Sequence, residues 1–368
     1  MVSLGEISAQ KPARRKKKGN RALKAILAVL AAVAVLIGGT FVGLKIWWDS
    51  NVKAPEEVTP EELDVNVELP TSGVVNIALL GLDDRFNTNK GRSDAIIILT
   101  ADMDHNKIKL TSIARDTLLN VEGYGSNKNS RDDDWTKITH AFTRGGAATT
   151  VKALNQNFNL NISKYAYVNF HEFAEIIDYL GGVDIEVKDR ELKQLNKHIR
   201  GMVKKSRLEI EELEGAGMQT LSGGQALAYA RLRKTDSDVV RGNRQKAVLK
   251  AAFDKVKEKP VTQYPELLAK VLGICNTNMG MRECLTLLNW AAKNSPEFEI
   301  FSMPDSEGKA YSWGGNTGAN KWGWVYVLDL DYATARLHDF IYETNTAEDM
   351  DAQKLKSPKF PAHMKEED

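Results

Sequence analysis

Residues 74–116 read VVNIALLGLDDRFNTNKGRSDAIIILTADMDHNKIKLTSIARD, three apolar runs separated by polar segments. The runs at Val74–Leu82, Ala95–Thr100 and Lys107–Ile113 are short and rich in β-branched residues, which predicts buried strands. The Asp-Met-Asp-His-Asn segment between the last two runs has the composition of a turn, so these strands are expected to form a hairpin. This segment is therefore expected to supply three neighbouring strands of a sheet.

Alternating elements follow this sheet along the chain. Helical periodicity is found at Ala147–Phe158, Glu172–Leu180, Arg241–Glu258, Pro265–Leu272, Met281–Asn294 and Tyr332–Tyr342. Short apolar runs at Tyr165–Phe170, Val183–Val187 and Phe298–Ser302 predict further strands. Strands that alternate with helices predict an α/β fold, with a central, mostly buried mixed sheet inside a three-layer α-β-α arrangement.

The N-terminal region has a composition of its own. The chain of 368 residues has a net charge of only +1, but residues 1–45 contain nine basic residues and one acid, so they hold +8 and the remainder −7. Residues 25–44 contain no charge, and as a helix they would span about 30 Å, the thickness of a bilayer core. A cleaved signal peptide is the alternative, but its apolar region is usually only about 7–15 residues long.

Eight basic residues before the apolar run, and Trp47 and Trp48 after it, orient the predicted span. The positive-inside rule places residues 1–24 in the cytoplasm as a basic tail, 25–48 in the membrane as a signal anchor, and the rest outside the cell membrane. Because the basic run adjoins the apolar span, no nucleic-acid partner is expected. The Pro- and Glu-rich residues 49–72 predict a linker, 73–345 one catalytic domain, and 346–368 a polar tail.

Three local patterns have simpler explanations than the function they suggest. The LSGGQ sequence at 221–225 is typical of ABC ATPases, but the chain lacks the P-loop that such a site needs. Asp102-Met103-Asp104 matches the metal-binding DxD of glycosyltransferases, yet acidic turns are far commoner. Cys275 and Cys284 are compatible either with a disulfide outside the cell or with two buried thiols.

Arginines and aspartates gather where predicted strands end and a predicted helix begins. They are Asp83, Asp84, Arg85, Arg92, Asp94, Arg115, Asp116, Arg231, Arg233, Arg241 and Arg244. Gln245, which follows Arg244, adds an amide to this group. Ligands bind at strand ends in α/β sheets, and helix N-termini favour anions. Arginine forks suit phosphate, and carboxylates among them suggest Mg²⁺ shared with a diphosphate. The residues alone therefore predict an external, membrane-anchored domain that binds a phosphorylated ligand.

Seven ordered blocks between about Asn76 and about Lys255 resemble the LytR-CpsA-Psr family of Gram-positive cell-envelope proteins. The blocks are NIALLGLDDR, GRSDAIIILT, LTSIARDT, KITHAFTRGG, YLGGVDIEV, LSGGQALAYARLRK and DVVRGNRQKAVL. The resemblance implies a phosphotransferase that moves an anionic glycopolymer, such as a teichoic acid or capsular polysaccharide, from a polyprenyl-diphosphate carrier onto peptidoglycan. It also implies that the protein works at the cytoplasmic membrane, where carrier and acceptor meet.

The resemblance also assigns roles to individual residues. It implies that Asp83 and Asp94 bind Mg²⁺ and that a diphosphate site surrounds them. The implied diphosphate ligands are Arg85, Arg92, Arg115, Lys137, Arg231, Arg233, Arg241, Arg244 and Gln245. Arg115 and Arg231 would act in catalysis, with Asp94 as first and Asp116 as second candidate for the general base. The lipid tail would lie in an apolar pocket to which Ala147–Phe158 and Phe170–Leu180 contribute, although such stripes also pack ordinary cores.

Three other functions remain open from the sequence. Within the same chemistry, the chain is compatible with a polyprenyl-diphosphate pyrophosphatase or with a ligase that attaches glycan to protein. The acceptor distinguishes these activities, and no residue pattern reports it. A non-enzymatic envelope regulator or receptor is the third, although a cytoplasmic tail of 24 residues is too short for a DNA-binding domain.

Overall fold

The computed structural model describes residues 56–69, 72–84, 91–124, 134–206, 209–232, 238–305, 311–317, 322–347 and 350. All of them belong to one compact unit, Val52–Asp368. The predicted tail 1–24 and anchor 25–48 lie outside the described residues, as do Arg85 and Arg233. Within the part that is described, no helix has the length and apolar character needed to cross a bilayer.

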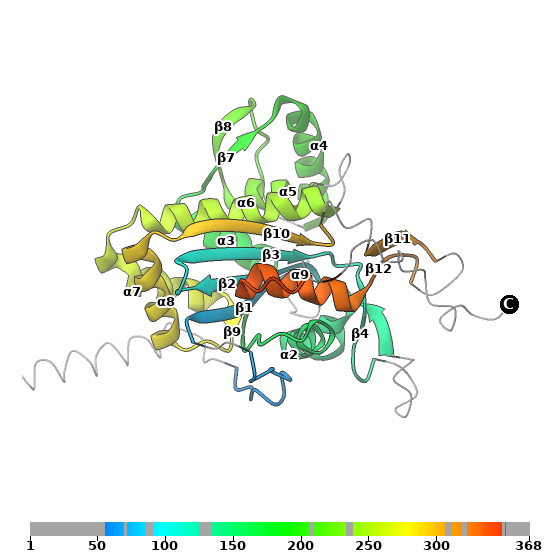
Figure 1. Cartoon of the computed structure of the whole chain (residues 1–368). Coiled ribbons are helices and arrows are strands. Elements are labelled where there is room, and N and C mark those ends of the chain that lie inside the picture. Colours follow the sequence, from blue (N-terminus) through cyan, green and yellow to red (C-terminus); the bar gives the residue numbers. More distant parts are fainter. Residues whose placement is uncertain are drawn as a thin grey trace, which may run out of the picture. The chain divides into compact units, whose positions relative to one another are not determined.

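A six-stranded mixed sheet forms the centre of the domain (Figure 1). Its strands, in spatial order, are β10 (Glu297–Met303), β3 (Lys107–Ile113), β2 (Arg92–Asp102), β1 (Val74–Asp83), β6 (Lys164–Val168) and β9 (Asn276–Thr277). The neighbours β1 and β2, β2 and β3, and β6 and β9 are antiparallel, whereas β1 runs parallel to β6 and β3 to β10. The predicted hairpin of β2 and β3 is confirmed.

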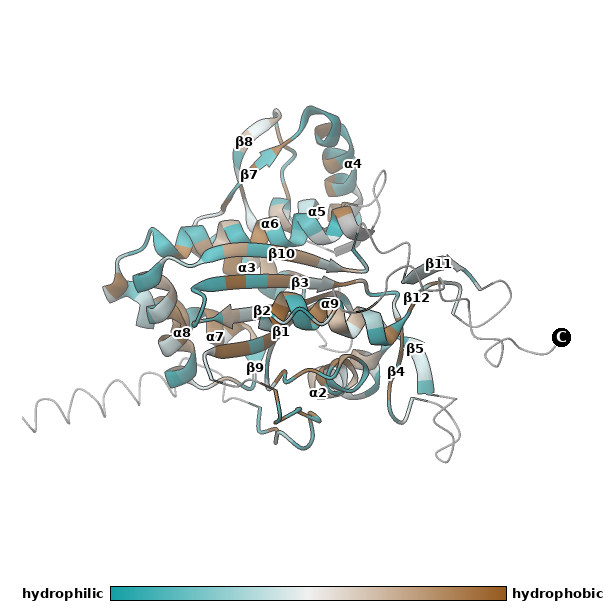
Figure 2. Cartoon of the chain, viewed as in Figure 1, coloured by the Kyte–Doolittle hydropathy of each residue, from teal (hydrophilic) through white to brown (hydrophobic). Residues whose placement is uncertain are grey.

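Helices cover both faces of this sheet, which confirms the three-layer α-β-α prediction. On one face, α2 (Thr139–Phe158) and α9 (Leu330–Tyr342) pack on alternate residues of β1 and β2, in a core that includes Leu80, Ile96 and Ile98. The other face meets α3 (Phe170–Leu180), α6 (Asp238–Lys257), α7 (Tyr264–Ile274) and α8 (Met281–Asn294). A short 3-10 helix, η2 (Val261–Gln263), leads into α7. In Figure 2 the central strands are largely hydrophobic, as burial on both faces requires.

A second core lies beyond α6 and was only partly predicted. It contains β7 (Val183–Val187), α4 (Asp189–Ser206), β8 (Gly217–Leu221) and α5 (Gly223–Arg231), and β7 pairs with β8 (Figure 1). Leu195 and Ile199 of α4 are fully buried against this core. Helix α5 begins at a capping box in which the side chains of Ser222 and Gln225 bind each other's backbone N–H groups. The LSGGQ sequence therefore starts a helix here.

Two small hairpins flank the end of β3. One pairs β4 (Leu118–Asn120) with β5 (Trp135–Lys137), and the other pairs β11 (Ser312–Asn316) with β12 (Trp324–Leu328). Figure 1 shows both beyond the right-hand end of the sheet. None of these four strands was predicted from the sequence. The predicted strand Tyr165–Phe170 is too long, because Asn169 caps α3 and accepts hydrogen bonds from the N–H groups of His171 and Glu172.

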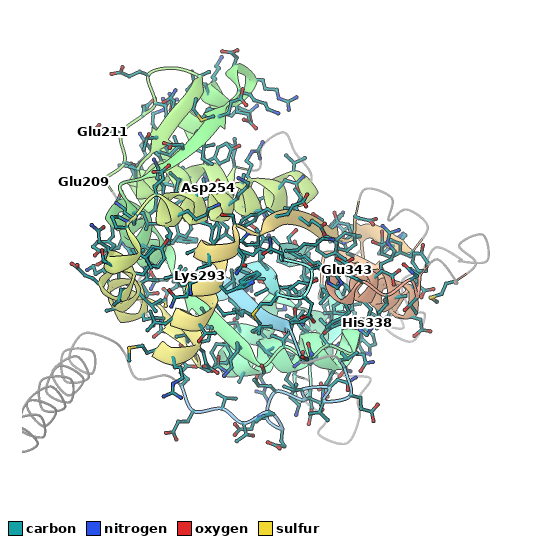
Figure 3. All side chains as sticks on the ribbon, turned by 60° about the vertical axis from the view of Figure 1, so that its left-hand side comes forward. Glu209, Glu211, Asp254, Lys293, His338 and Glu343 are labelled. Atoms are coloured by element: carbon teal, nitrogen blue, oxygen red, sulfur yellow. The ribbon has the colours of Figure 1, made fainter. Side chains whose placement is uncertain are left out.

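The DxD segment belongs to the turn between β2 and β3, at the end of β2 opposite to Asp94. Asp102 is 1% exposed and lies 2.8 Å from the ammonium of Lys109, which is also fully buried. Glu343, labelled in Figure 3, follows α9 and lies 2.9 Å from the same ammonium. The carboxylate of Asp102 thus neutralises a buried lysine, which supports the interpretation of this segment as an acidic turn.

Candidate active site

A β-bulge in β2 orients the first carboxylate of the site. Gly81 pairs with Ala95, but the next residue of β1, Leu82, pairs with Ser93, so Asp94 is an extra residue in β2. A bulge turns the extra side chain toward the same face as its neighbour. Asp94 and Ala95 accordingly both line one cavity, together with Asp83 at the end of β1. The register also places exposed Arg92 opposite Asp83.

Four alternating charges run from this bulge to the end of β3. Arg115 Nη1 lies 2.6 Å from Asp94 Oδ1, and Arg115 Nε lies 3.2 Å from Asp116 Oδ2. Lys137 Nζ is 2.9 Å from Asp116 Oδ1. These side chains are between 13% and 22% exposed, so they are accessible to a ligand. The structure therefore joins Asp94, the adjacent Arg115 and Asp116, and Lys137, from three separate segments of the chain, into one network.

Arg231, the last residue of α5, lies next to Asp83, which lines the same cavity as Asp94. Its guanidinium stacks 3.8 Å above the ring centroid of Phe170, the first residue of α3, and lies 3.6 Å from Asp83. Arg241 and Gln245, one turn apart on α6, also line the cavity. Two arginines from different helices thus point their charge at the space next to Asp83 and Asp94.

Two cations of α6 do not line the cavity. Arg244 is buried, with Nη2 2.8 Å from Glu191 of α4 and Nη1 donating to Leu232 O at 3.0 Å. Lys246 is 1% exposed and donates to Phe301 O at 2.6 Å and to Ser302 Oγ at 2.7 Å. Burial lowers the pKa of Lys246 to about 8. Arg244 thus joins α6 to α4, and Lys246 joins α6 to β10 of the sheet. Together these contacts position Arg241 and Gln245 on α6.

The cavity has a volume of about 850 Å³ and lies between the sheet and α3 to α7. Asp83, Asp94, Arg115, Arg231 and Arg241 line the end of the cavity next to the ion-pair network, which is called its mouth below. The rest of the lining, its body, is mainly apolar, apart from Asn169, from Gln245 of α6, and from Gln194, Lys197 and His198 of α4. Phe170, Phe173, Ile176 and Ile177 of α3 line the body, which confirms the pocket predicted for Phe170–Leu180. The prediction for Ala147–Phe158 was wrong, because α2 packs on the opposite face of the sheet. Cys275 also lines the cavity, and no disulfide joins it to Cys284.

His140 at the start of α2 is a residue of the site that the sequence analysis did not single out. Its Nδ1 lies 2.8 Å from Thr136 Oγ1, and its ring stacks on that of Tyr124. Burial lowers its pKa to about 4, and the positive charges of Arg92 and Lys137 add to this effect. The imidazole is therefore neutral at neutral pH. The block KITHAFTRGG contained it, but a single histidine gives no spacing signal.

The donor chemistry of Asp83 and Asp94 fits a hard divalent cation. Both carboxylates line the mouth of the cavity, and oxygen ligands suit Mg²⁺, which usually takes only one or two carboxylates and completes its shell with water and phosphate. The pairing of Asp94 with Arg115 leaves its second carboxylate oxygen available in principle. Among the described residues, only Asp102, His105 and Glu343, at the other end of the sheet, form a cluster of three metal-binding side chains.

An apolar cavity with a cationic mouth, set in a three-layer α/β domain, defines a protein that handles an amphiphile with an anionic head group. Residues 47–323 match the model of the LytR_cpsA_psr family, and the chain belongs to that family.

Curated relatives and solved structures agree with this assignment. The chain is 28% identical over 287 residues to polyisoprenyl-teichoic acid–peptidoglycan teichoic acid transferase TagT of Bacillus subtilis strain 168, covering 74% of this chain and 83% of the relative. It is 30% identical to the TagU transferase of Halalkalibacterium halodurans, covering 76% and 88%. The crystal structure of B. subtilis TagT matches with a TM-score of 0.56 at 25% identity, covering 74% and 93%. TagT bound to LI-WTA matches with a TM-score of 0.56 at 26% identity, covering 79% and 96%.

Proposed function

We propose that this protein is a phosphotransferase that moves an anionic glycopolymer from a polyprenyl-diphosphate carrier onto peptidoglycan. The observation on which the proposal depends is the cavity of about 850 Å³, with its apolar body and its mouth of arginines and carboxylates. Curated relatives are named for the same transfer, from polyisoprenyl-teichoic acid to peptidoglycan. TagT, a structural neighbour, binds LI-WTA.

The donor would bind with its lipid in the cavity and its diphosphate at the mouth. The side chains of α3, α6 and α7 would bury the polyprenyl chain, at a gain of roughly 25 cal/mol for each Å² of apolar surface removed from water. Arg231, Arg241 and Gln245 would hold the diphosphate from the helical side, and Arg115 and Lys137 from the side of the sheet. We also assign Arg92, Arg85 and Arg233 to this cationic group, the last two from sequence position alone.

The reaction begins when a hydroxyl oxygen of the acceptor sugar attacks the phosphorus bonded to the glycan. The bond from that phosphorus to the bridging oxygen breaks, and polyprenyl phosphate leaves with the electron pair. Arg115 and Arg231, already positioned, stabilise the negative charge that develops on the leaving phosphate. Asp83 and Asp94 would hold Mg²⁺, which when bound would supply additional positive charge to the diphosphate site.

The hydroxyl proton needs an acceptor near the attacking oxygen. We assign this role first to Asp94, provided that it is not also bound to the metal, and second to Asp116, since both carboxylates lie beside Arg115. A balanced transfer then leaves one new phosphodiester, one polyprenyl phosphate and one proton passed on to solvent.

We further propose that the protein acts at the outer face of the cell membrane. The uncharged run at residues 25–44 and the eight basic residues before it support a single-pass anchor with a cytoplasmic N-terminus. A membrane-anchored enzyme meets both its lipid donor and the wall acceptor there. Two fusions to the C-terminus test this topology, one with a reporter active only outside the cytoplasm and one with a reporter active only inside it, and activity of the second reporter alone would contradict it.

The activity is tested with the full chain in detergent micelles, polyprenyl-diphosphate glycan, Mg²⁺, and peptidoglycan present or absent. The wild type is expected to release polyprenyl phosphate and to form glycan-linked peptidoglycan. Arg115→Ala is expected to lower the rate about 10²–10³-fold, the usual effect of removing one preorganised donor. Arg282→Ala, a matched change of an exposed arginine on α8, serves as the control.

The outcomes separate the alternative functions. Release of polyprenyl phosphate without transfer would indicate a pyrophosphatase, and transfer only to protein would indicate a protein ligase. No release under any condition, together with equal activity of the two arginine variants in cells, would leave only a regulator or receptor.

A further inference from the structure

The β11–β12 hairpin has an outward face that the proposed reaction does not use. Cross-strand partners in an antiparallel pair share a face, and the pairs Gly314 with Tyr326 and Asn316 with Trp324 alternate with pairs that point inward. By the same register Ser312 lies opposite Leu328, which is 7% exposed and packs in the main core, so this face is buried at that end. Its remaining residues, Ser312, Gly314, Asn316, Trp324 and Tyr326, together are called the aromatic face below. Trp324 is 40% exposed, and Gly314 and Asn316 are exposed as well.

The inward face of the same hairpin supports this arrangement. Val325 and Val327 are buried in a small core with Leu118 of β4, against which Trp135 and Trp313 pack. The indole N–H of Trp322 donates to Trp135 O at 3.2 Å. The hairpin is therefore anchored through its inward side chains, and the ring of Trp324 is not needed to fill that core.

Glycine at position 314 allows the two outward rings to lie close to the strand. A Cβ added at Gly314 would lie 3.1 Å from Tyr326 Cε1 and 3.2 Å from Trp324 Cζ2, which is tighter than ordinary contact. The rings of Trp324 and Tyr326 are 4.5 Å apart and nearly perpendicular, at 86°. The result is an exposed indole that a perpendicular phenol ring supports from one side.

The aromatic face adjoins the ion-pair network of the candidate active site. The backbone N–H of Tyr326 donates to Asp116 O at 3.0 Å, and Thr117 forms an isolated parallel bridge with Tyr326. The side chain of Asp116 binds Lys137 and Arg115. Two residues of strand span about 7 Å, so Trp324 lies about one sugar ring farther from the network than Tyr326 does.

We propose that the aromatic face binds the sugar rings of the acceptor glycan, the uncharged polysaccharide backbone of peptidoglycan. A pyranose ring presents C–H groups on one face, which pack on an indole, and hydroxyl and amide groups at its edge, which suit Ser312 and Asn316. This inference rests on the proposed function, because it assigns the surface that brings the attacking hydroxyl to the site.

Charge and position favour the acceptor over the donor as the occupant. None of the described residues on the aromatic face is charged, whereas an anionic glycopolymer would be expected to select lysine and arginine. The cavity for the lipid donor is lined by Arg115 but by no described residue of the hairpin. The hairpin instead touches the network at Asp116, away from the lipid. Donor and acceptor would thus approach the Arg115–Asp116 pair from different sides.

Binding is tested on the full chain in detergent micelles with a soluble oligomer of β-1,4-linked N-acetylglucosamine as the probe, by isothermal titration. The wild type is expected to bind the probe, Trp324→Ala to weaken binding about tenfold, and Trp324→Phe to restore most of it because an aromatic ring is present again. Gly314→Ile, whose side chain would cover the face and displace both rings from the strand, is expected to weaken binding as well. Met218→Ala removes a side chain that is 71% exposed on the distant β8 and is the matched control.

Kinetics provide the second test. In the transfer assay Trp324→Ala is expected to raise KM for peptidoglycan about tenfold, with an unchanged KM for the polyprenyl-diphosphate donor. A higher KM for the donor alone would assign the face to the donor glycan and overturn the proposal. Equal probe binding by the wild type, Trp324→Ala and Gly314→Ile would also overturn it. Because probe binding needs no turnover, failure of the proposed transferase activity is distinguishable from failure of this inference.

Discussion

Arg231→Ala is the substitution that best separates a ligand-facing arginine from a structural one. The guanidinium of Arg231 is 23% exposed, stacks on Phe170 at 3.8 Å and lies 3.6 Å from Asp83. A partly exposed cation–π contact stabilises by about 0.5–1 kcal/mol, and a partly exposed ion pair by about 0–1 kcal/mol. The substitution should therefore lower the free energy of unfolding by only about 1–2 kcal/mol.

The effect on activity should be much larger. A preorganised donor to the developing charge contributes about 3–4 kcal/mol to the transition state, which corresponds to a rate loss of about 10²–10³. At about 2–4 °C for each kcal/mol, the melting temperature should fall by less than about 8 °C. Arg231→Ala is thus expected to be a folded protein with very little activity.

Arg244→Ala provides the comparison, since Arg244 is only thirteen residues away but is buried. Its side chain is 5% exposed and its partner Glu191 is 10% exposed. Removing one member of a buried pair leaves a buried charge and costs about 3–5 kcal/mol. The loss of activity in this variant should follow its loss of folded protein.

Both variants are compared by thermal unfolding, followed by circular dichroism, and by release of polyprenyl phosphate at a temperature where the wild type is folded. If Arg231→Ala unfolds as readily as Arg244→Ala, or is folded and fully active, then Arg231 is a structural ion-pair residue and the reasoning about the cavity mouth is wrong. If Arg244→Ala is folded and stable but inactive, Arg244 belongs to the ligand site.

Three further predictions concern charge, packing and metal. The wild type should become more stable as the pH rises from about 8 toward 10, because in that window the unfolded chain still binds the Lys246 proton and the folded chain has lost it. Lys246→Met should abolish this gain, which urea unfolding of both proteins at several pH values checks. Gly223→Ala should strongly destabilise the protein, because a Cβ there would lie 2.0 Å from Ala174 O. In Gly201→Ala, on α4, the added Cβ meets no neighbour within 4 Å, so this change should stabilise the protein by about 0.5–1 kcal/mol. Equal melting temperatures of the two variants would contradict this. Mg²⁺ should raise the melting temperature of the wild type, and this shift should disappear in Asp83→Asn and Asp94→Asn.

Much of the sheet and its covering helices could be predicted because each buries a strong apolar pattern. The run at Ala95–Thr100 can hardly form anything except a buried strand, and the structure places it at the centre of β2. Helix α4 was missed although Leu195, Ile199 and Met202 repeat at helical spacing, because charged residues surround them. The strand β12 was missed because Gly and Trp around it suggested no regular element.

The candidate site could be predicted as a set of residue types but not as a geometry. Arg241 and Gln245 are separated by one helical turn and share a face, so both reach the cavity. Arg244, on the same helix, turns toward Glu191 of α4, a helix that the sequence analysis did not predict. The side of the sheet that holds the cavity was also undetermined, because apolar helix faces look alike whether they pack on a core or surround a ligand.

The bulge at Asp94 shifts by one residue the alternation of β2 side chains between the two faces of the sheet. After the bulge, the even-numbered Ile96 and Ile98 face α2. Before the bulge, the odd-numbered Ser93 faces α2 instead, because it pairs with Leu82 of the same core. Deleting Asp94 would give a regular strand in which Ser93 and Ile96 still share a face, so both faces of β2 would be kept and only the carboxylate at the bulge would be lost. A homologous strand of regular length would therefore have to present its carboxylate from a different position, so chain length at this point is as informative about the chemistry as residue identity.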